Sequence, residues 1–440
     1  MSMLMAGAAQ AACSATPSQP LNGITTNNSQ VDCSGVTSGA TITANANNVL
    51  VSVRLFGTQL NNSTVTVNGT NDTIEVRQSA TTSNTSFSAT GTNASVQFVD
   101  TVNSFVTVNV SGADSAFRIN AGAITSANQG SIALSGPAGS TSTFGLAGQL
   151  YGASVAGSAY LVRGTTGNQS FELRTGSTLG VQADGRAIDG GAGDDSFLIE
   201  DGAFISGGTS NNIVFNGGAD NDTMTILGSG TSNYNSINLE TLVLDPGAGG
   251  LRILNGSHGD VSQLHVDSGT VNVTNLAALG QTNSTVLVAQ GASLELNING
   301  ISTFNQSFSG TGTIRQLDGV NILAGNSSGF SGTYVIDFNR TILGSSNALG
   351  TAGIINNSLL FFSDFAVAND ISGTGQVVHN GPGIGTLSGT NSFTGDLGIL
   401  SGGIRLTNVN AGGSGNTIRA MNPGTFGLEL DIAADGTLSN

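Results

Sequence analysis

Short runs of alternating apolar and polar residues recur along the whole chain, and each run ends in Gly, Asn, Asp or Ser. Examples are STVTVNG, SFELRTG, TVNVTN and SLELNING. A period of two turns one face of a strand toward a core, and small polar residues favour turns. No stretch keeps the apolar spacing of a helix over three helical turns. The pattern therefore predicts an all-β fold built from many short strands.

The composition favours a β-solenoid over a string of β-sandwiches. The 440-residue chain has 65 Gly, no Trp and only four Tyr, whereas a sandwich relies on Trp and Tyr to anchor its core. In a solenoid each short strand pairs with the strand one turn away, at a spacing of about 4.8 Å, and Gly and Asn form the corners. We therefore expect a solenoid with roughly 20 to 25 residues per turn and roughly 18 to 22 turns.

The charge of the chain argues against several kinds of partner. The formal net charge is −16, and all 11 basic residues are arginines. Such a chain has few cations with which to neutralise nucleic-acid phosphates or to bind anionic membranes. No stretch has the 18 or more strongly apolar residues of a transmembrane helix. We expect no nucleic-acid partner and no transmembrane helix.

Two segments near the C-terminus repeat each other. One starts at Ser309 and reads SGTGTIRQLDGVNILAGNSSGFSGTYVI, and the other starts at Ser372 and reads SGTGQVVHNGPGIGTLSGTNSFTGDLGI. Both open with SGTG and later carry Phe-x-Gly, at Phe330 and at Phe393. Loose repetition of strand and turn units at a fixed offset is typical of solenoids.

These units, over residues 309–336 and 372–406, resemble the passenger-associated repeats of bacterial autotransporters. The preceding GDDSFLIEDGAFISGG resembles the stretch often found before those repeats, and the match covers about residues 185–410. The resemblance implies a secreted passenger domain that folds as a right-handed parallel β-helix and is delivered across the outer membrane by a C-terminal β-barrel. The sequence stops at LDIAADGTLSN without the amphipathic strands of such a barrel, so we expect the barrel to be missing.

The N-terminal segment predicts export. Ala9-Gln10-Ala11 fits a signal-peptidase site, but no positive charge precedes it, which is the pattern of a truncated signal peptide. The only two cysteines, Cys13 and Cys33, would form one disulfide in an exported protein or remain as two free thiols. We expect a signal-peptide remnant at 1–11, an N-terminal cap region at 12–60, a β-solenoid at 61–308, and an autotransporter-associated repeat region of the same solenoid, truncated at its C-terminus, at 309–440.

Two glycine-rich stretches raise the question of a calcium site. GGAGDDSFL starts at Gly190 and GGADNDTMT starts at Gly217; the first matches the calcium-binding nonapeptide of β-rolls and the second nearly does. In a β-roll each nonapeptide makes half a turn, so this offset of three half-turns would place the loops on opposite faces. One loop supplies only part of the six to eight ligands of Ca²⁺, so we favour structural turns and no cofactor, with calcium as the alternative. The candidate metal ligands are Asp194, Asp195, Asp220 and Asp222.

Catalytic patterns are sparse. The histidines are His258, His265 and His379, and no GxSxG elbow accompanies them. His265 and Asp267 would share one face of a strand, but neighbours on a single strand do not make a triad. The acid pairs named above would act as paired carboxylates only if the fold brought carboxylates together across turns. We do not expect an enzyme.

The expected function is structural and adhesive. The resemblance implies an exported protein at the outer-membrane surface of a Gram-negative bacterium, or secreted from it. A surface rich in Asn, Ser and Thr would bind polar ligands such as host-cell or matrix glycans and proteins, with multivalency raising the affinity. Two alternatives stay open: a carbohydrate-active lyase or hydrolase on a β-helix, and a calcium-binding secreted β-roll protein.

Overall fold

A computed structural model describes residues 12–53, 59–77, 80–152, 160–181, 185–207, 213–422 and 427–430. Strands stacked in parallel sheets form a β-solenoid of about 17 turns. The expected all-β, parallel β-solenoid is confirmed, with slightly fewer turns than the 18 to 22 expected. The expected signal-peptide remnant lies outside the described residues.

The chain forms two compact units, which are described separately. The first comprises residues 1–225 and 234–239, and the second comprises residues 226–233 and 240–440. The division falls within strand β25 (Thr223–Leu227). The repeat region expected from residue 309 onward lies inside the second unit.

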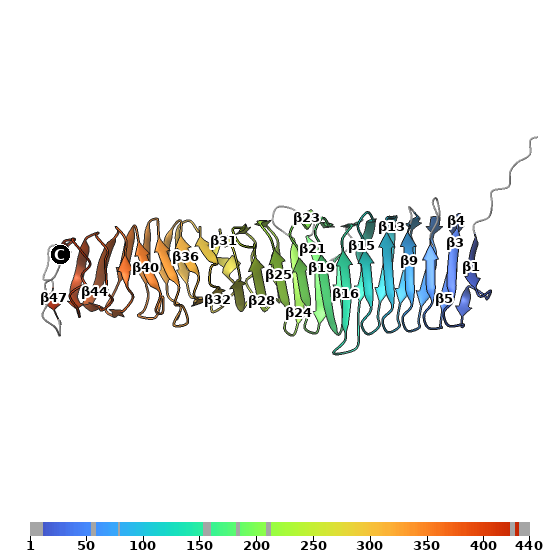
Figure 1. The fold of residues 1–440 in the computed structure, drawn as a ribbon, viewed down its shortest axis with the longest axis horizontal. Coiled ribbons are helices and arrows are strands. Elements are labelled where there is room, and N and C mark those ends of the chain that lie inside the picture. Colours follow the sequence, from blue (N-terminus) through green and yellow to red (C-terminus); the bar gives the residue numbers. More distant parts are fainter. Residues whose placement is uncertain are drawn as a thin grey trace, which may run out of the picture. The chain divides into compact units, whose positions relative to one another are not determined.

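Two parallel sheets build the first unit (Figure 1). The strands of one sheet, in order of pairing, are β1 (Ala12–Thr16), β3 (Gln30–Ser34), β6 (Leu50–Val53), β9 (Thr73–Arg77), β12 (Ser95–Val99), β14 (Ala116–Ile119), β16 (Thr141–Leu146), β19 (Asn168–Leu173) and β22 (Ser196–Ile199). The main path of the other is β2 (Asn22–Ile24), β5 (Thr41–Ala44), β8 (Thr64–Val67), β11 (Ser86–Ala89), β13 (Val102–Val110), β15 (Ile124–Leu134), β18 (Val162–Gly164), β21 (Arg186–Ala192), β24 (Val214–Ala219) and β27 (Asn235–Ile237). Its branches are β4 (Val36–Ser38), β7 (Gln59–Asn61), β10 (Thr81–Ser83), β17 (Gln149–Gly152), β20 (Thr178–Val181) and β23 (Phe204–Gly207).

Aligned aromatic side chains fill the interior of this unit. Phe117, Phe144, Phe171 and Phe197 occupy the same position on four successive turns, and all four are buried. Ring centroids are 5.7 Å apart between the first two and 5.1 Å apart between the last two. Burying one such side chain contributes about 1.5–3 kcal/mol, so the alternation in the sequence becomes a continuous core.

Asparagines form one column of corners. Asn48, Asn71 and Asn93 have left-handed φ values of 56°, 58° and 54°, a conformation that Asn tolerates better than most residues. Their side chains also bond from turn to turn: Asn71 Nδ2 donates to Asn48 Oδ1 at 3.1 Å, and Asn93 Nδ2 donates to Asn71 Oδ1 at 3.3 Å. Each corner therefore supports the next.

The N-terminal edge has a different geometry. Strand β1 runs antiparallel to β3, and in this sheet the parallel stacking begins where β3 pairs with β6. A disulfide between Cys13 and Cys33 links β1 to β3. An antiparallel, cross-linked strand covers backbone groups that would otherwise form an open edge. Within residues 12–60, β1 therefore covers the N-terminal edge of the sheet that continues through β3.

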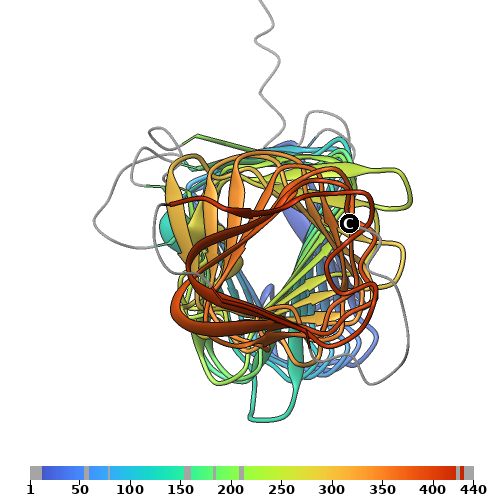
Figure 2. The ribbon, with the colours of Figure 1, turned by 90° about the vertical axis from the view of Figure 1, so that its left-hand side faces the viewer.

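The second unit contains the remaining strands, whose turns enclose an apolar interior when viewed from the C-terminal end (Figure 2). Its first group is β28 (Thr241–Asp245), β30 (Gln263–Val266), β32 (Thr285–Val288) and β35 (Ser307–Gly310). The second is β26 (Gly230–Ser232), β29 (Leu251–Leu254), β31 (Thr270–Val273), β33 (Ser293–Leu296), β36 (Thr313–Gln316), β38 (Thr333–Ile336), β40 (Gly353–Asn356) and β43 (Ile371–Ser372). The third is β34 (Ile301–Phe304), β37 (Val320–Leu323), β39 (Arg340–Leu343), β41 (Leu359–Phe362), β44 (Gln376–Leu387), β45 (Leu397–Leu406) and β46 (Ile418–Ala420), with β42 (Ala366–Val367) and β47 (Gly427–Leu430) as branches.

One turn of the second unit contains a short helix, the 3-10 helix η1 (Leu276–Leu279), between β31 and β32. The side chain of Asn275 caps it by accepting a hydrogen bond from the Ala278 N–H at 3.0 Å. Gly280 ends it with a φ of 89°, a conformation that favours glycine. A Cβ on Gly280 would lie 2.4 Å from the Val261 carbonyl oxygen, so the chain can pass there only with glycine.

Candidate functional site

The two glycine-rich loops lie on the same side of neighbouring turns. Gly191 pairs with Gly218, and Ala192 pairs with Ala219, in the parallel register of β21 and β24. The expectation that they would lie on opposite faces was wrong. An offset of 27 residues makes one full turn here, because these turns are longer than the 18-residue turn of a β-roll.

The two buried acids of these loops hold backbone groups. Asp195 Oδ1 accepts a hydrogen bond from the Gln169 N–H at 2.6 Å, and Asp222 Oδ1 accepts one from the Asp195 N–H at 2.8 Å. Both side chains are buried. Each carboxylate therefore supplies the acceptor for an amide of the preceding turn, which would otherwise be buried without a partner.

The two exposed acids do the same at the loop surface. Asp194 Oδ1 accepts from the Asn221 N–H at 3.0 Å, and Asp220 Oδ2 accepts from the Gly193 N–H at 3.2 Å. Among the residues that the structure describes, no group of three or more His, Cys, Asp or Glu side chains is placed to hold a metal ion. All four candidate calcium ligands thus bind backbone amides.

Burial changes the protonation of Asp195. Loss of solvent raises the pKa of its carboxyl to about 7, against the opposing hydrogen bond from Gln169, and the nearby carboxylates of Asp222, Asp189 and Asp194 raise it further. The pKa of Asp72 is also raised by burial, although this side chain accepts hydrogen bonds from the N–H groups of Val49 and Gly69. Buried polar residues occupy the equivalent position on several turns of the unit: Asp72, Ser115, Ser142, Gln169 and Asp195.

A second polar cluster lies on β18, β21 and β24. Arg163 and Asp189 face each other with 3.9 Å between Nε and Oδ2. Asn216 Nδ2 donates to Asp189 Oδ1 at 2.6 Å, and Asn238 Nδ2 donates to Asn216 Oδ1 at 2.8 Å. The cluster therefore joins one carboxylate, one guanidinium and two amides. Like the asparagine corners, it connects successive turns through side-chain hydrogen bonds. It does not provide the facing pair of carboxylates that glycoside hydrolysis uses.

Two of the three histidines are buried, and His265 is half-buried on β30. Burial lowers the pKa of His258 to about 4. His379, on β44, lies with Nδ1 2.9 Å from the Ser401 carbonyl oxygen and Nε2 3.1 Å from Asp364 Oδ1. The Ser401 hydroxyl instead donates to the Gly381 carbonyl at 2.9 Å. His379 therefore joins neighbouring turns and does not activate the adjacent serine as a nucleophile.

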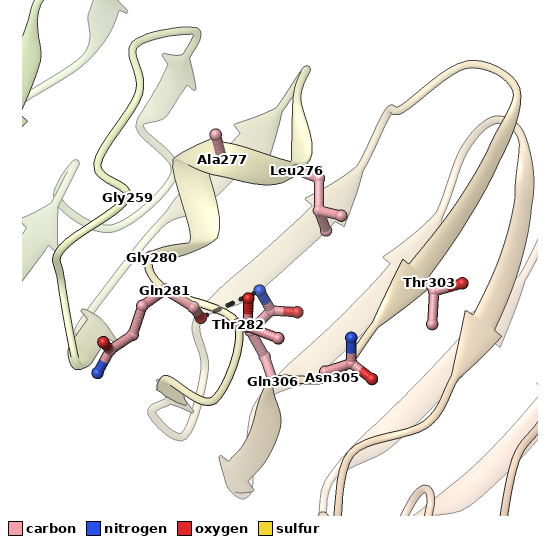
Figure 3. A pocket seen from close by; sticks show the side chains of 9 residues that line it. All are labelled: Gly259, Leu276, Ala277, Gly280, Gln281, Thr282, Thr303, Asn305 and Gln306. Carbon is pink, nitrogen blue, oxygen red and sulfur yellow. Dashed lines mark hydrogen bonds between the residues drawn. The ribbon is translucent and has the colours of Figure 1, made fainter.

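A pocket of about 450 Å³ opens in the second unit between η1 and β34, the first strand of the third group of strands in that unit (Figure 3). No titratable side chain lines it. Gln306 lies at its inner side with 3% of its surface exposed. The lining residues are Gly259, Leu276, Ala277, Gly280, Gln281, Thr282, Thr303, Asn305 and Gln306.

Sequence analysis missed this pocket. Its only local sign is NLAALGQT at residues 275–282, where the strand alternation stops for one turn. That interruption becomes η1, and the strand β34 occupies the corresponding part of the next turn. The pocket forms because η1 on one turn lies next to β34 on the following turn. This arrangement depends on two turns together, so no local sequence motif encodes it.

No family model, no curated protein and no solved structure matches this chain. In the described part of the chain no helix is both long and apolar enough to cross a membrane. The fold is therefore shown by the structure alone, and the resemblance to autotransporter passengers stays a prediction from the sequence.

Proposed function

We propose that this chain is an exported, non-catalytic binding protein, a surface passenger that attaches to polar ligands of host cells or matrix. The uncharged pocket beside η1 carries the proposal, because it offers amides, hydroxyls and glycine backbone to a ligand but no general acid, base or nucleophile. The signal-peptide remnant expected from the sequence and the resemblance of its repeats to autotransporter passengers support the proposed location.

The titratable groups of the chain are consistent with this role. Two acids of the first unit whose pKa burial raises, Asp72 and Asp195, lie beneath the surface and bind backbone amides. Asp189, whose pKa burial also raises, is half-buried, accepts from the Asn216 side chain and faces Arg163. The His379–Asp364 pair bridges turns. Perturbed groups at active sites normally line a cleft, so their use as turn supports favours binding over catalysis. No observation favours the lyase or hydrolase alternative enough to propose it.

A binding survey of residues 12–440 tests the proposal. The purified chain is passed over immobilised matrix proteins and over neutral and acidic glycans, and the same glycans are analysed for cleavage products after incubation. We expect saturable retention on at least one polar surface and no new reducing or unsaturated ends. Cleavage of a polysaccharide, or retention on none of the surfaces, would contradict it.

A further inference from the structure

We propose that the pocket between η1 and β34 is a binding site for a neutral saccharide, with Gln306 at its inner side and Gln281, Thr282, Thr303 and Asn305 around its opening. This inference rests on the proposed function and names the class of ligand.

The backbone of β34 offers unpaired groups to the pocket. This strand is the edge strand of its sheet, and β37 bonds to it through the carbonyls of Gly300 and Phe304, which accept from Val320 and Ala324. In a parallel pair, alternate residues bond to the same neighbour. The N–H and C=O of Thr303 therefore point to the other side, toward η1 and the pocket.

The side chains around the opening are free to bind. Gln281, Thr282, Thr303 and Asn305 are exposed and make no side-chain hydrogen bond to any other described residue. Polar side chains elsewhere in this unit satisfy each other across turns. Asn255 Nδ2 donates to Asn233 Oδ1 at 3.2 Å, and Thr274 Oγ1 donates to Asn255 Oδ1 at 2.8 Å. At the pocket the amides and hydroxyls are not joined into such a ladder.

The orientation of Gln306 is fixed by its neighbour. Its Nε2 donates to the Gln281 carbonyl oxygen at 3.4 Å, and a carbonyl accepts but does not donate. The amide oxygen is therefore on the opposite side, and Figure 3 shows it turned away from Gln281. This Oε1 is buried and accepts no hydrogen bond from the described residues. A buried acceptor without a donor costs about 1–3 kcal/mol, so the wall of the pocket formed by Gln306 holds one unsatisfied polar group.

The chemistry of the lining selects a neutral, polyhydroxylated ligand. Every polar group present is an amide, a hydroxyl or a backbone group, and sugar hydroxyls both donate and accept hydrogen bonds, as these groups do. With no Arg, Lys, His, Asp or Glu in the lining, an ionic sugar would lose solvation without gaining a counter-charge. An extended peptide is less suited, because β34 has four residues and only alternate ones face the open side. A volume of about 450 Å³ is within the range of small-ligand pockets.

The test is direct titration of residues 12–440 by calorimetry and saturation-transfer NMR. The probes are methyl glycosides and trisaccharides of glucose, galactose, mannose and N-acetylglucosamine, with glucuronate, sialic acid and an uncharged hexapeptide as competitors. We expect a neutral sugar to bind and its ring protons to receive saturation. Asn305→Ala and Gln281→Ala should each weaken binding about tenfold, and Thr282→Trp, which fills the pocket from an exposed position, should abolish it.

Asn283→Ala is the matched control, because Asn283 is exposed beside Thr282 but does not line the pocket. It should bind like the unmodified chain, and circular dichroism should show all four variants folded. Sugar binding that is unchanged in the three pocket variants would overturn this site while leaving the proposed function intact. Binding of only the acidic sugars or only the peptide would overturn the saccharide class. Binding of no probe, together with failure of the broader survey, would overturn both.

Discussion

At the scale of single residues, Asp195 shows how burial couples the fold to pH. Its ordinary pKa of 3.8 is raised to about 7 in the folded chain. Between these values the folded chain holds a proton that the unfolded chain has released. The free energy of unfolding therefore falls as pH rises through this window, because the unfolded state binds fewer protons.

Asp195→Asn should remove this dependence. Asparagine keeps an Oδ1 to accept from the Gln169 N–H and adds no ionisable group. At about pH 8 we expect the free energy of unfolding of the variant to exceed that of the unmodified chain by on the order of a few kcal/mol, so the variant should also melt at a higher temperature. Its stability should depend less on pH between about 5 and 8. Thermal melts across this range provide the measurement. Asp201→Asn, at an exposed position, is the control, and parallel profiles for all three proteins would contradict the account.

Glycine is required at some positions by the distance between turns. A Cβ on Gly190 would lie 2.1 Å from the Gly217 carbonyl oxygen and 2.4 Å from Asp195 Oδ2. A Cβ on Gly145 would meet only Arg118 Cγ, at an ordinary 3.5 Å. Gly190→Ala should therefore destabilise the first unit by about 1–3 kcal/mol, whereas Gly145→Ala should be nearly neutral. Chemical denaturation distinguishes the two, and equal midpoints would show that the turns can separate.

At the scale of elements, the glycine-rich loops behave as turn supports. Because each of the four candidate ligand acids already accepts a backbone N–H, we expect EDTA to leave the melting temperature and the circular dichroism spectrum unchanged. Melting with added calcium, with magnesium and with EDTA provides the comparison. A melting temperature several degrees higher with calcium alone would make these loops a metal site.

The sequence indicates the elements well and their stacking less well. Alternation in STVTVNG or SFELRTG is a local property, and the corresponding strands form as expected. The number of residues per turn is not local, because loops of different length connect equally good strands. From the sequence, the 27-residue offset between Gly190 and Gly217 was therefore interpreted as three half-turns. The pairing of β21 with β24 shows that it is one full turn.

The candidate sites divide in the same way. The preference for turns over calcium could be argued from the loops themselves, since Gly and Asp are turn residues whatever they bind. The buried position of Asp72 and the pocket at Gln306 could not, because burial depends on which residue lies one turn above. The sequence NLAALGQT does not indicate that the edge strand β34 lies on the next turn.

At the scale of the whole molecule, the ends of the stack need protection. Strand β1 covers the edge of β3 and is held there by the Cys13–Cys33 disulfide. An uncovered edge pairs with other chains. We expect the double variant Cys13→Ser, Cys33→Ser to form concentration-dependent oligomers under conditions where the unmodified chain does not.

Size-exclusion chromatography with light scattering measures this effect. A deletion of residues 12–16 should oligomerise further, since it removes the covering strand as well as the link. If both variants elute as the unmodified chain does, the β3 edge is not an interaction-prone surface.

The regular register of the second unit has a consequence for how such a chain changes over generations. Thr313, Thr333 and Gly353 occupy the same position on three successive turns, 20 residues apart. Each turn contacts chiefly its neighbours. Duplication or loss of one complete turn would therefore leave every remaining column aligned, whereas loss of a single residue within a strand would exchange its inner and outer faces. This fold therefore tolerates insertion or deletion of complete turns, and related proteins should differ in length by whole turns.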